Sequence, residues 1–207
     1  HIHLGTGLIT KKLVDPVDMV KILDVLVGIP TVLIDRDPSQ IIRREIYGLA
    51  GEYRLPKHGL EYRVPSNFWL LDYKLASMIF GLARLAVNVA EGFIRNSKQQ
   101  WAKDALLDRV DFDKVQQAIN TNDLSLARET FKPVHAFIQD HVRTVDLGLS
   151  GCLLEAFTHF TEKINEAGIE YWFPQDPIEH WSSEDLGYGW ESFLTAKVMA
   201  DKSRHTI

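Results

Sequence analysis

Two short segments of the chain carry side chains that could bind a metal ion and a phosphate together. From Leu60 onward, apolar or aromatic residues alternate with charged ones, which is the pattern of a half-buried β-strand. Glu61 and Arg63 therefore share one face, and Leu60, Tyr62 and Val64 share the other. A carboxylate is a hard ligand for a divalent cation, and a guanidinium is a planar fork that fits phosphate oxygens. The alternative is a cross-strand ion pair on a solvated face, where Glu and Arg are common.

The first residues of the chain show the same alternation. His1 and His3 share one face of a predicted strand, and Ile2 and Leu4 share the other. Two imidazoles that lie two residues apart on a strand can reach one metal–phosphate centre. The alternative is that both histidines belong to an exposed or vector-derived terminus.

Arginines gather in the same part of the sequence. Arg43, Arg44, Arg54 and Arg63 fall within a stretch of about twenty residues. Clustered arginines are usually solvated. Next to histidine and glutamate side chains, however, they could surround the phosphates of a nucleotide.

Length and composition restrict the class of protein. The chain has 207 residues, which is enough to bury a substantial core, and its formal charge of −5 argues against a general nucleic-acid binder. Cys152 is the only cysteine, so no internal disulfide can form, which fits a reducing compartment. We find no apolar run long enough to span a bilayer and no signal peptide, so we expect no membrane partner.

The remaining elements are predicted to be mostly helical. Asp15 and Pro16 form a helix start, and the Gly28–Pro30 stretch is expected to end or kink that helix. Further helices are predicted at 41–47, 72–95, 97–107, 111–120, 123–131, 133–147 and 153–167.

Several other side chains of types that can do chemistry are expected to have structural roles. The spacing of His135, His141 and His159 favours surface or core positions over a zinc site. The aromatic stretch at 171–190 favours a small satellite core, although it could also close over a substrate or contact a neighbouring subunit.

Taken together, these segments resemble the active-site strands of glutamine synthetase-like carboxylate–amine ligases, and the phage-type branch most closely. That branch has a His-x-His-x-Gly strand, a paired arginine, Tyr-Gly-x-Ala-Gly-x-x-Arg, Gly-x-Glu-Tyr-Arg and Ser-Asn-Phe-Trp. The resemblance covers about residues 1–95. The matching positions are His1, His3, Gly5, Arg43, Arg44, Tyr47, Gly48, Ala50, Gly51, Arg54, Gly59, Glu61, Tyr62, Arg63 and the segment 66–69.

The resemblance implies an ATP- and Mg²⁺-dependent ligase that joins a small-molecule or peptide carboxylate to an amine through an acyl phosphate. It implies His1 and Glu61 as metal ligands and His3 and Arg44 as contacts to ATP. It also implies that Arg54 and Arg63 hold the transferring phosphoryl group. It suggests the bacterial cytoplasm as location, including for a phage-encoded protein, and it is compatible with a homo-oligomer. A kinase-like or ATP-grasp phosphotransferase is disfavoured, because no Walker-type phosphate loop is present.

The expected fold class is α+β, with part of a glutamine synthetase-like curved antiparallel sheet followed by a mainly helical region. We expect residues 1–95 to form the C-terminal part of the catalytic domain and residues 96–207 a helical extension packed on it. Such ligases bring further carboxylates from strands before the His-x-His strand, so we expect this chain to be a fragment of a longer protein. The alternative function is a non-catalytic scaffold or binding component of a viral or other large assembly.

Overall fold

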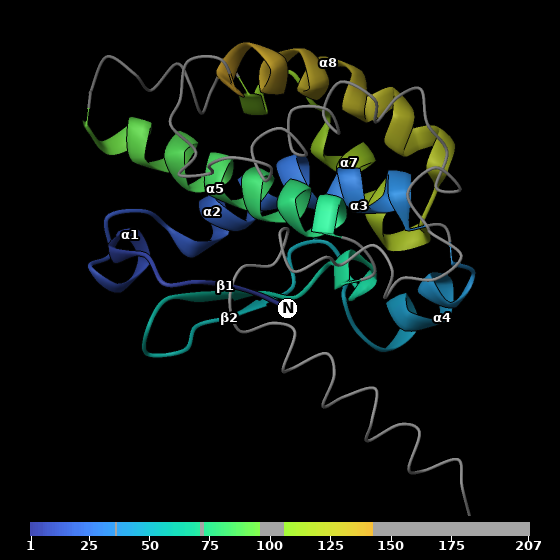
Figure 1. Cartoon of the computed structure of the whole chain (residues 1–207), viewed down its shortest axis with the longest axis horizontal. Coiled ribbons are helices and arrows are strands. Elements are labelled where there is room, and N and C mark those ends of the chain that lie inside the picture. The colour runs from blue at the N-terminus through green and yellow to red at the C-terminus, as the bar shows by residue number, and fades with distance from the viewer. Residues whose placement is uncertain (36, 71–72, 96–105, 143–207) are drawn as a thin grey trace, which may run out of the picture.

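The computed structural model describes residues 1–35, 37–70, 73–95 and 106–142 (Figure 1). It is an α+β fold, as predicted: a small antiparallel sheet lies against a larger helical part. The elements, in chain order, are β1 (Ile2–Leu4), α1 (Gly7–Thr10), α2 (Pro16–Leu23), a π-helical segment η1 (Asp24–Gly28), α3 (Ile29–Ile34), α4 (Ser39–Ile46), β2 (Tyr53–Arg54), β3 (Leu60–Tyr62), a 3₁₀ turn η2 (Phe68–Leu70), α5 (Tyr73–Arg95), α7 (Phe112–Thr121) and α8 (Leu124–Val142).

The sheet has the order β1–β3–β2, and both pairings are antiparallel. The apolar face predicted for β3 is buried, because Leu60, Tyr62 and Val64 are fully buried. The expectation of a half-buried strand is corrected, because Glu61 on the other face is buried as well. The strand is shorter than the sequence pattern suggested and ends at Tyr62. Ile2 on β1 is also buried, so the apolar side of the sheet faces the helices.

Helices α2 and α3 are joined by η1 into one helical run rather than separated at Gly28–Pro30. Asp15 caps the N-terminus of α2 through a hydrogen bond from the Val17 N–H, at 2.8 Å. Pro30 has no N–H and would crowd the carbonyl four residues before it in a regular helix, and the π turn relieves that conflict. Every residue of η1 and α3 is buried, so packing holds this irregular segment in place.

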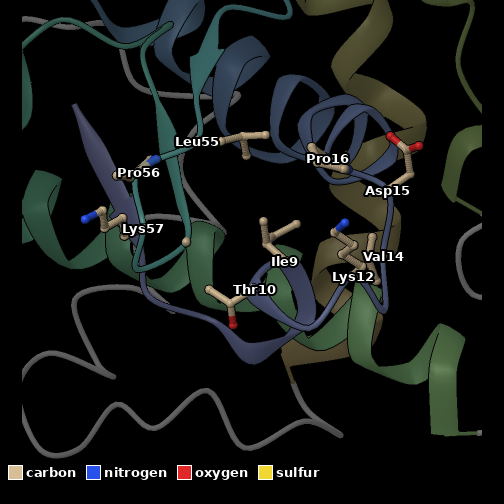
Figure 2. Close-up of a pocket in the computed structure, with 10 residues that line it drawn as sticks. Ile9, Thr10, Lys12, Val14, Asp15, Pro16, Leu55, Pro56 and Lys57 are labelled. Atoms are coloured by element: carbon tan, nitrogen blue, oxygen red, sulfur yellow. The ribbon is translucent and has the colours of Figure 1, made fainter.

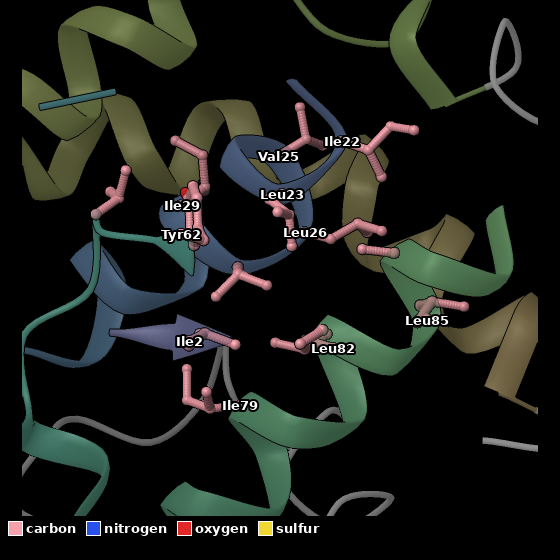
Figure 3. Packing of buried hydrophobic residues seen from close by; sticks show 14 of the residues in the cluster. Ile2, Ile22, Leu23, Val25, Leu26, Ile29, Tyr62, Ile79, Leu82 and Leu85 are labelled. Atoms are coloured by element: carbon pink, nitrogen blue, oxygen red, sulfur yellow. The ribbon is translucent and has the colours of Figure 1, made fainter. Parts of the chain in front are cut away.

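Helix α5 corrects the expectation that no segment could span a membrane. Its residues 75–92 are long and apolar enough to do so, with a mean hydropathy of 1.3. However, 72% of that stretch is buried inside the structure, which is also what a core helix shows, so the membrane indication is weak. Ile79 and Leu82 of α5 lie beside Ile2 of β1 in the core (Figure 3).

Helix α8 was predicted as two helices separated at Pro133, and the structure shows one. Ala127, Phe131, Val134 and Ile138 are all buried, so the helical apolar stripe continues across the proline. Packing of this stripe against α3 and α7 outweighs the hydrogen bond that Pro133 cannot donate. Helix α7 agrees with its prediction and is capped by Asp111.

The helices form layers that pack on one another and on the sheet. Helices α2, η1 and α5 pack together, α2 also contacts β3, and α7 and α8 pack on α3 (Figure 1). Buried residues from Ile2 to Ile138 form one hydrophobic cluster. The proposed domain boundary near residue 95 stays a prediction. Most of the helix predicted at 97–107, the helix at 153–167, His159 and the aromatic stretch at 171–190 lie outside the described residues.

Candidate functional site

The outer face of the sheet carries two rows of charged or imidazole side chains. The strand register places His3 of β1 opposite Glu61 of β3, and Arg54 of β2 opposite Glu61 from the other side. One residue further along, the Arg63 N–H donates to the Glu52 carbonyl at 3.1 Å, which places those two residues side by side. Continuing the register of β1 brings His1 across from Arg63. The site is therefore built by three adjacent strands with period-two alternation.

His1, His3 and Glu61 form a compact set of potential metal ligands. One ligand atom from each lies within 4.8 Å of the other two. His1 Nδ1 is 2.9 Å from Glu61 Oε1. That oxygen is buried, and neither His1 nor Arg63 Nε at 3.5 Å makes a well-aligned hydrogen bond to it. A buried carboxylate oxygen without a hydrogen bond is costly unless a further group satisfies it.

Arg63 lies between two carboxylates. Its Nη1 is 2.9 Å from Glu52 Oε1, while its Nε faces Glu61. The second oxygen of Glu52 accepts a hydrogen bond from the Gly48 N–H. The guanidinium is therefore held in one orientation at the edge of the cluster, with a side chain that is 17% exposed.

Tyr47 connects the histidine to the arginines. Its hydroxyl and His1 Nε2 share a hydrogen bond of 2.6 Å. The guanidinium carbons of Arg43 and Arg63 lie 4.5 Å and 4.7 Å from the centre of its ring. These contacts link Tyr47, His1 and Glu61 in a chain that the sequence pattern did not predict.

A comparison with protein-family models finds that residues 1–142 match the Phage phiEco32-like COOH.NH2 ligase-type 2 family. The chain belongs to this family. The resemblance inferred from the sequence motifs is thus confirmed, and with it the general chemistry of carboxylate–amine ligation. No curated protein and no solved structure matches the chain.

Arg54 and His3 lie at the solvent-exposed end of the cluster on the outer face of the sheet. Both residues are exposed, and Arg54 makes no ion pair among the described residues. The His3 ring stacks near the ring of His58, with centroids 5.9 Å apart and an angle of 24° between the planes. Both Arg54 and His3 are therefore accessible to a ligand.

Arg44 is not brought into this cluster. It is 5% exposed, and its Nη1 donates to the Val64 carbonyl at 2.7 Å. Burial lowers the pKa of Arg44 to about 10, so it remains a cation at neutral pH, inside the protein. The neighbouring Arg43 faces the site instead, because successive residues of helix α4 point in different directions. Because the two arginines are adjacent in the sequence, the sequence alone could not tell which of them faces the site.

The buried side of β3 holds a second polar group. The Tyr62 hydroxyl donates to Asp24 Oδ1 at 2.7 Å, and both side chains are buried. Burial raises the pKa of Asp24 to about 7 and raises the pKa of Tyr62 well above its ordinary value. Asp24 belongs to the π segment, so this bond ties the helical layer to the strand that carries Glu61. Sequence reasoning missed Asp24 and Glu52. It included Arg43 in the arginine cluster but assigned the contact with ATP to Arg44.

Among the described residues, two of the hollows lie near the sheet. A groove of about 400 Å³ runs between β1 and α5 and includes His3, Phe80 and Arg84 in its walls. A second hollow of about 520 Å³ lies between the 9–16 segment and the 55–59 turn, with Lys12 and Lys57 at its edge (Figure 2). Only the first contains a side chain of the candidate site, so it is the better place for a substrate close to the cluster.

The cluster fits a divalent cation in part. Two ligands at right angles, each about 2.1 Å from an ion, lie about 3 Å apart, which is close to the separation of His1 Nδ1 and Glu61 Oε1. Magnesium prefers oxygen ligands, so a single carboxylate leaves most of its coordination to water and phosphate.

Proposed function

We propose that this chain carries part of the active site of an ATP- and magnesium-dependent carboxylate–amine ligase. The observation that supports it most is the gathering of His1, His3 and Glu61 beside Arg54 and Arg63 on one sheet face. Family membership supports the ligation of a carboxylate to an amine. The use of ATP, magnesium and an acyl phosphate is our proposal, based on the chemistry of these side chains.

In this proposal His1 and Glu61 hold a magnesium ion, and His3 contacts a phosphate of ATP. The bound ion supplies charge neutralisation to the phosphate oxygens. Glu61 suits this role because its buried Oε1 has no other well-aligned partner. His1 suits it because its Nδ1 already faces that oxygen.

The arginines would stabilise the transferring phosphoryl group. A substrate carboxylate oxygen forms a bond to the γ-phosphorus of ATP, and the bond to the ADP oxygen breaks. An amine nitrogen then attacks the acyl carbon, phosphate leaves with the bonding electrons, and the nitrogen loses a proton. Arg63, held by Glu52, offers a fixed charge, and exposed Arg54 offers a second charge that a ligand can reach. Fixed cations that face developing negative charge lower the barrier without reorganisation.

The test uses the full-length protein with ATP, magnesium and pooled amino acids and polyamines, and measures phosphate release. We expect release that depends on the amine and falls by about 100-fold or more in Glu61→Gln. Glu45→Gln, on the exposed face of α4, serves as a matched control and should behave as the wild type.

Absence of turnover would count against the proposal if ATP binding measured by calorimetry were also independent of magnesium. That result would favour the alternative, a ligase-derived scaffold or binding component. Turnover retained by Glu61→Gln would instead show that this carboxylate is not a metal ligand.

A further inference from the structure

Tyr47 is held firmly at the edge of the candidate site. It follows the last turn of α4, where the backbone changes from helical to extended. The next residue, Gly48, has φ of +89°, and a Cβ at that position would overlap the guanidinium of Arg43. The Gly48 N–H also donates to Glu52. The backbone on the C-terminal side of the tyrosine is therefore fixed by groups that belong to the site.

Arg43 provides a rigid support on one side of the Tyr47 ring. Its guanidinium donates to the backbone carbonyls of Arg63, Val64 and Pro65 at 2.8–3.0 Å. Three carbonyl acceptors leave this cation little freedom to move. Arg63 lies close to the same ring, so the aromatic ring keeps the two cations in fixed places through cation–π contacts.

The hydroxyl of Tyr47 determines which nitrogen of His1 faces Glu61. Because Nε2 is hydrogen-bonded to the tyrosine, Nδ1 is the nitrogen directed at the carboxylate. A flip of the imidazole would break both contacts. Groups that bond the second nitrogen of a metal-binding histidine fix its tautomer and orientation, and their loss typically weakens metal binding by 10- to 100-fold.

We propose that Tyr47 is the positioning residue of this site: its hydroxyl orients the His1 imidazole toward the cation, and its ring holds Arg63 in place. The inference rests on the proposed function, since it assumes a cation between His1 and Glu61. It assigns a role to a tyrosine that touches neither the cation nor the reacting atoms.

Two substitutions separate the two roles. Tyr47→Phe removes the hydroxyl and keeps the ring, whereas Tyr47→Leu removes both. We expect Tyr47→Phe to weaken binding of Mn²⁺ alone to the full-length protein by about 10-fold in calorimetry. We expect Tyr47→Leu to weaken, in addition, binding of the non-hydrolysable ATP analogue adenylyl imidodiphosphate. Tyr53→Phe is the matched control, because Tyr53 pairs with Tyr62 and packs against the core.

A spectroscopic measurement distinguishes positioning from general stability. In NMR spectra of the metal-free protein, nuclear Overhauser contacts should define one orientation of the His1 ring in the wild type and more than one in Tyr47→Phe, with an unchanged melting temperature. If the hydroxyl acts through the His1 imidazole, then adding Tyr47→Phe to a His1→Asn variant should not change the Mn²⁺ affinity of that variant.

Equal Mn²⁺ affinity and equal His1 spectra in the wild type and Tyr47→Phe would overturn the role of the hydroxyl. Equal binding of the ATP analogue by Tyr47→Phe and Tyr47→Leu would overturn the role of the ring. If the wild type itself binds no Mn²⁺, the cation part of the proposed function fails, and the orientation of the His1 ring in the NMR spectra still decides whether Tyr47 orients the imidazole.

Discussion

At the scale of single residues, both sequence-based interpretations of Glu61 and Arg63 describe part of what the structure shows. Arg63 Nε lies 3.5 Å from Glu61 Oε1, which is close enough for an ion pair. Arg63 Nη1 lies closer to Glu52 Oε1, at 2.9 Å. Glu61 is buried rather than solvated. Its Oε1 lies 2.9 Å from His1 Nδ1 and 3.5 Å from Arg63 Nε, and neither contact is a well-aligned hydrogen bond, so Glu61 differs from the surface ion pair that the alternative describes.

Asp24 gives a prediction about pH and stability. Burial raises the pKa of this carboxyl to about 7 in the folded protein, whereas the ordinary pKa of an aspartate is 3.8. Between these values the folded state binds more protons than the unfolded state, so the contribution of Asp24 to stability falls as pH rises and is constant above about pH 7.

Asp24→Asn should remove that pH dependence. Urea denaturation should show a larger destabilisation by the substitution at pH 5 than at pH 8, with a difference on the order of a few kcal/mol. The exposed Asp108→Asn is the control and should leave the pH profile unchanged. A parallel pH dependence in the wild type and Asp24→Asn would show that Asp24 is ionised in the folded protein.

At the scale of secondary-structure elements, the turn before β3 decides how the site strands align. Gly59 has φ of +152°, and a Cβ there would overlap the carbonyl oxygen of Leu4 on β1. Backbone atoms cannot rotate away as a side chain can. The close approach of β1 to this turn therefore requires glycine.

Gly59→Ala should push β1 away from β3 and separate the histidines from Glu61. We expect loss of Mn²⁺ binding in calorimetry, together with a destabilisation of about 2 kcal/mol or more. Gly51→Ala is a matched control, since Gly51 also has a positive φ, +80°, but open space around its Cβ position. Gly51→Ala should lower the free energy of unfolding only by the backbone strain, about 1–2 kcal/mol. Similar Mn²⁺ affinities for the two variants would contradict this explanation.

The helical elements show where local sequence rules fail. Caps at Asp15 and Asp111 predicted two helix starts correctly, because a side-chain oxygen that accepts a backbone N–H acts locally. Pro30 and Pro133 were expected to end or separate helices, and neither does. In both places the helix continues because buried apolar faces on either side of the proline pack against other helices.

At the scale of the whole molecule, one core joins the sheet to the helices. Ile2 of β1 lies beside Leu82 of α5, and Leu82 is 1% exposed (Figure 3). Because the buried residues form one cluster, a cavity at this place should weaken the sheet and the helices together.

Leu82→Ala should therefore lower the free energy of unfolding by about 2–5 kcal/mol in urea denaturation. Hydrogen exchange should accelerate by a similar factor for amides in β3 and in α8. Phe80→Ala, on the same helix with a side chain 51% exposed, is the control and should cost much less. Faster exchange in β3 alone would mean that the sheet unfolds independently of the helices.

The sequence by itself determined which side chains share a face, because alternation along a strand is local geometry. It therefore predicted His1 with His3, Glu61 with Arg63, and the buried Leu60, Tyr62 and Val64, and its motifs predicted the ligase family. Only the tertiary structure decided which strands are neighbours and in what register. That register brings Glu52 to Arg63. The placement of helix α4 brings Tyr47 to His1, and it leaves Arg44 inside while Arg43 reaches the site. Such contacts join residues up to 46 positions apart, and they depend on packing that no local pattern encodes.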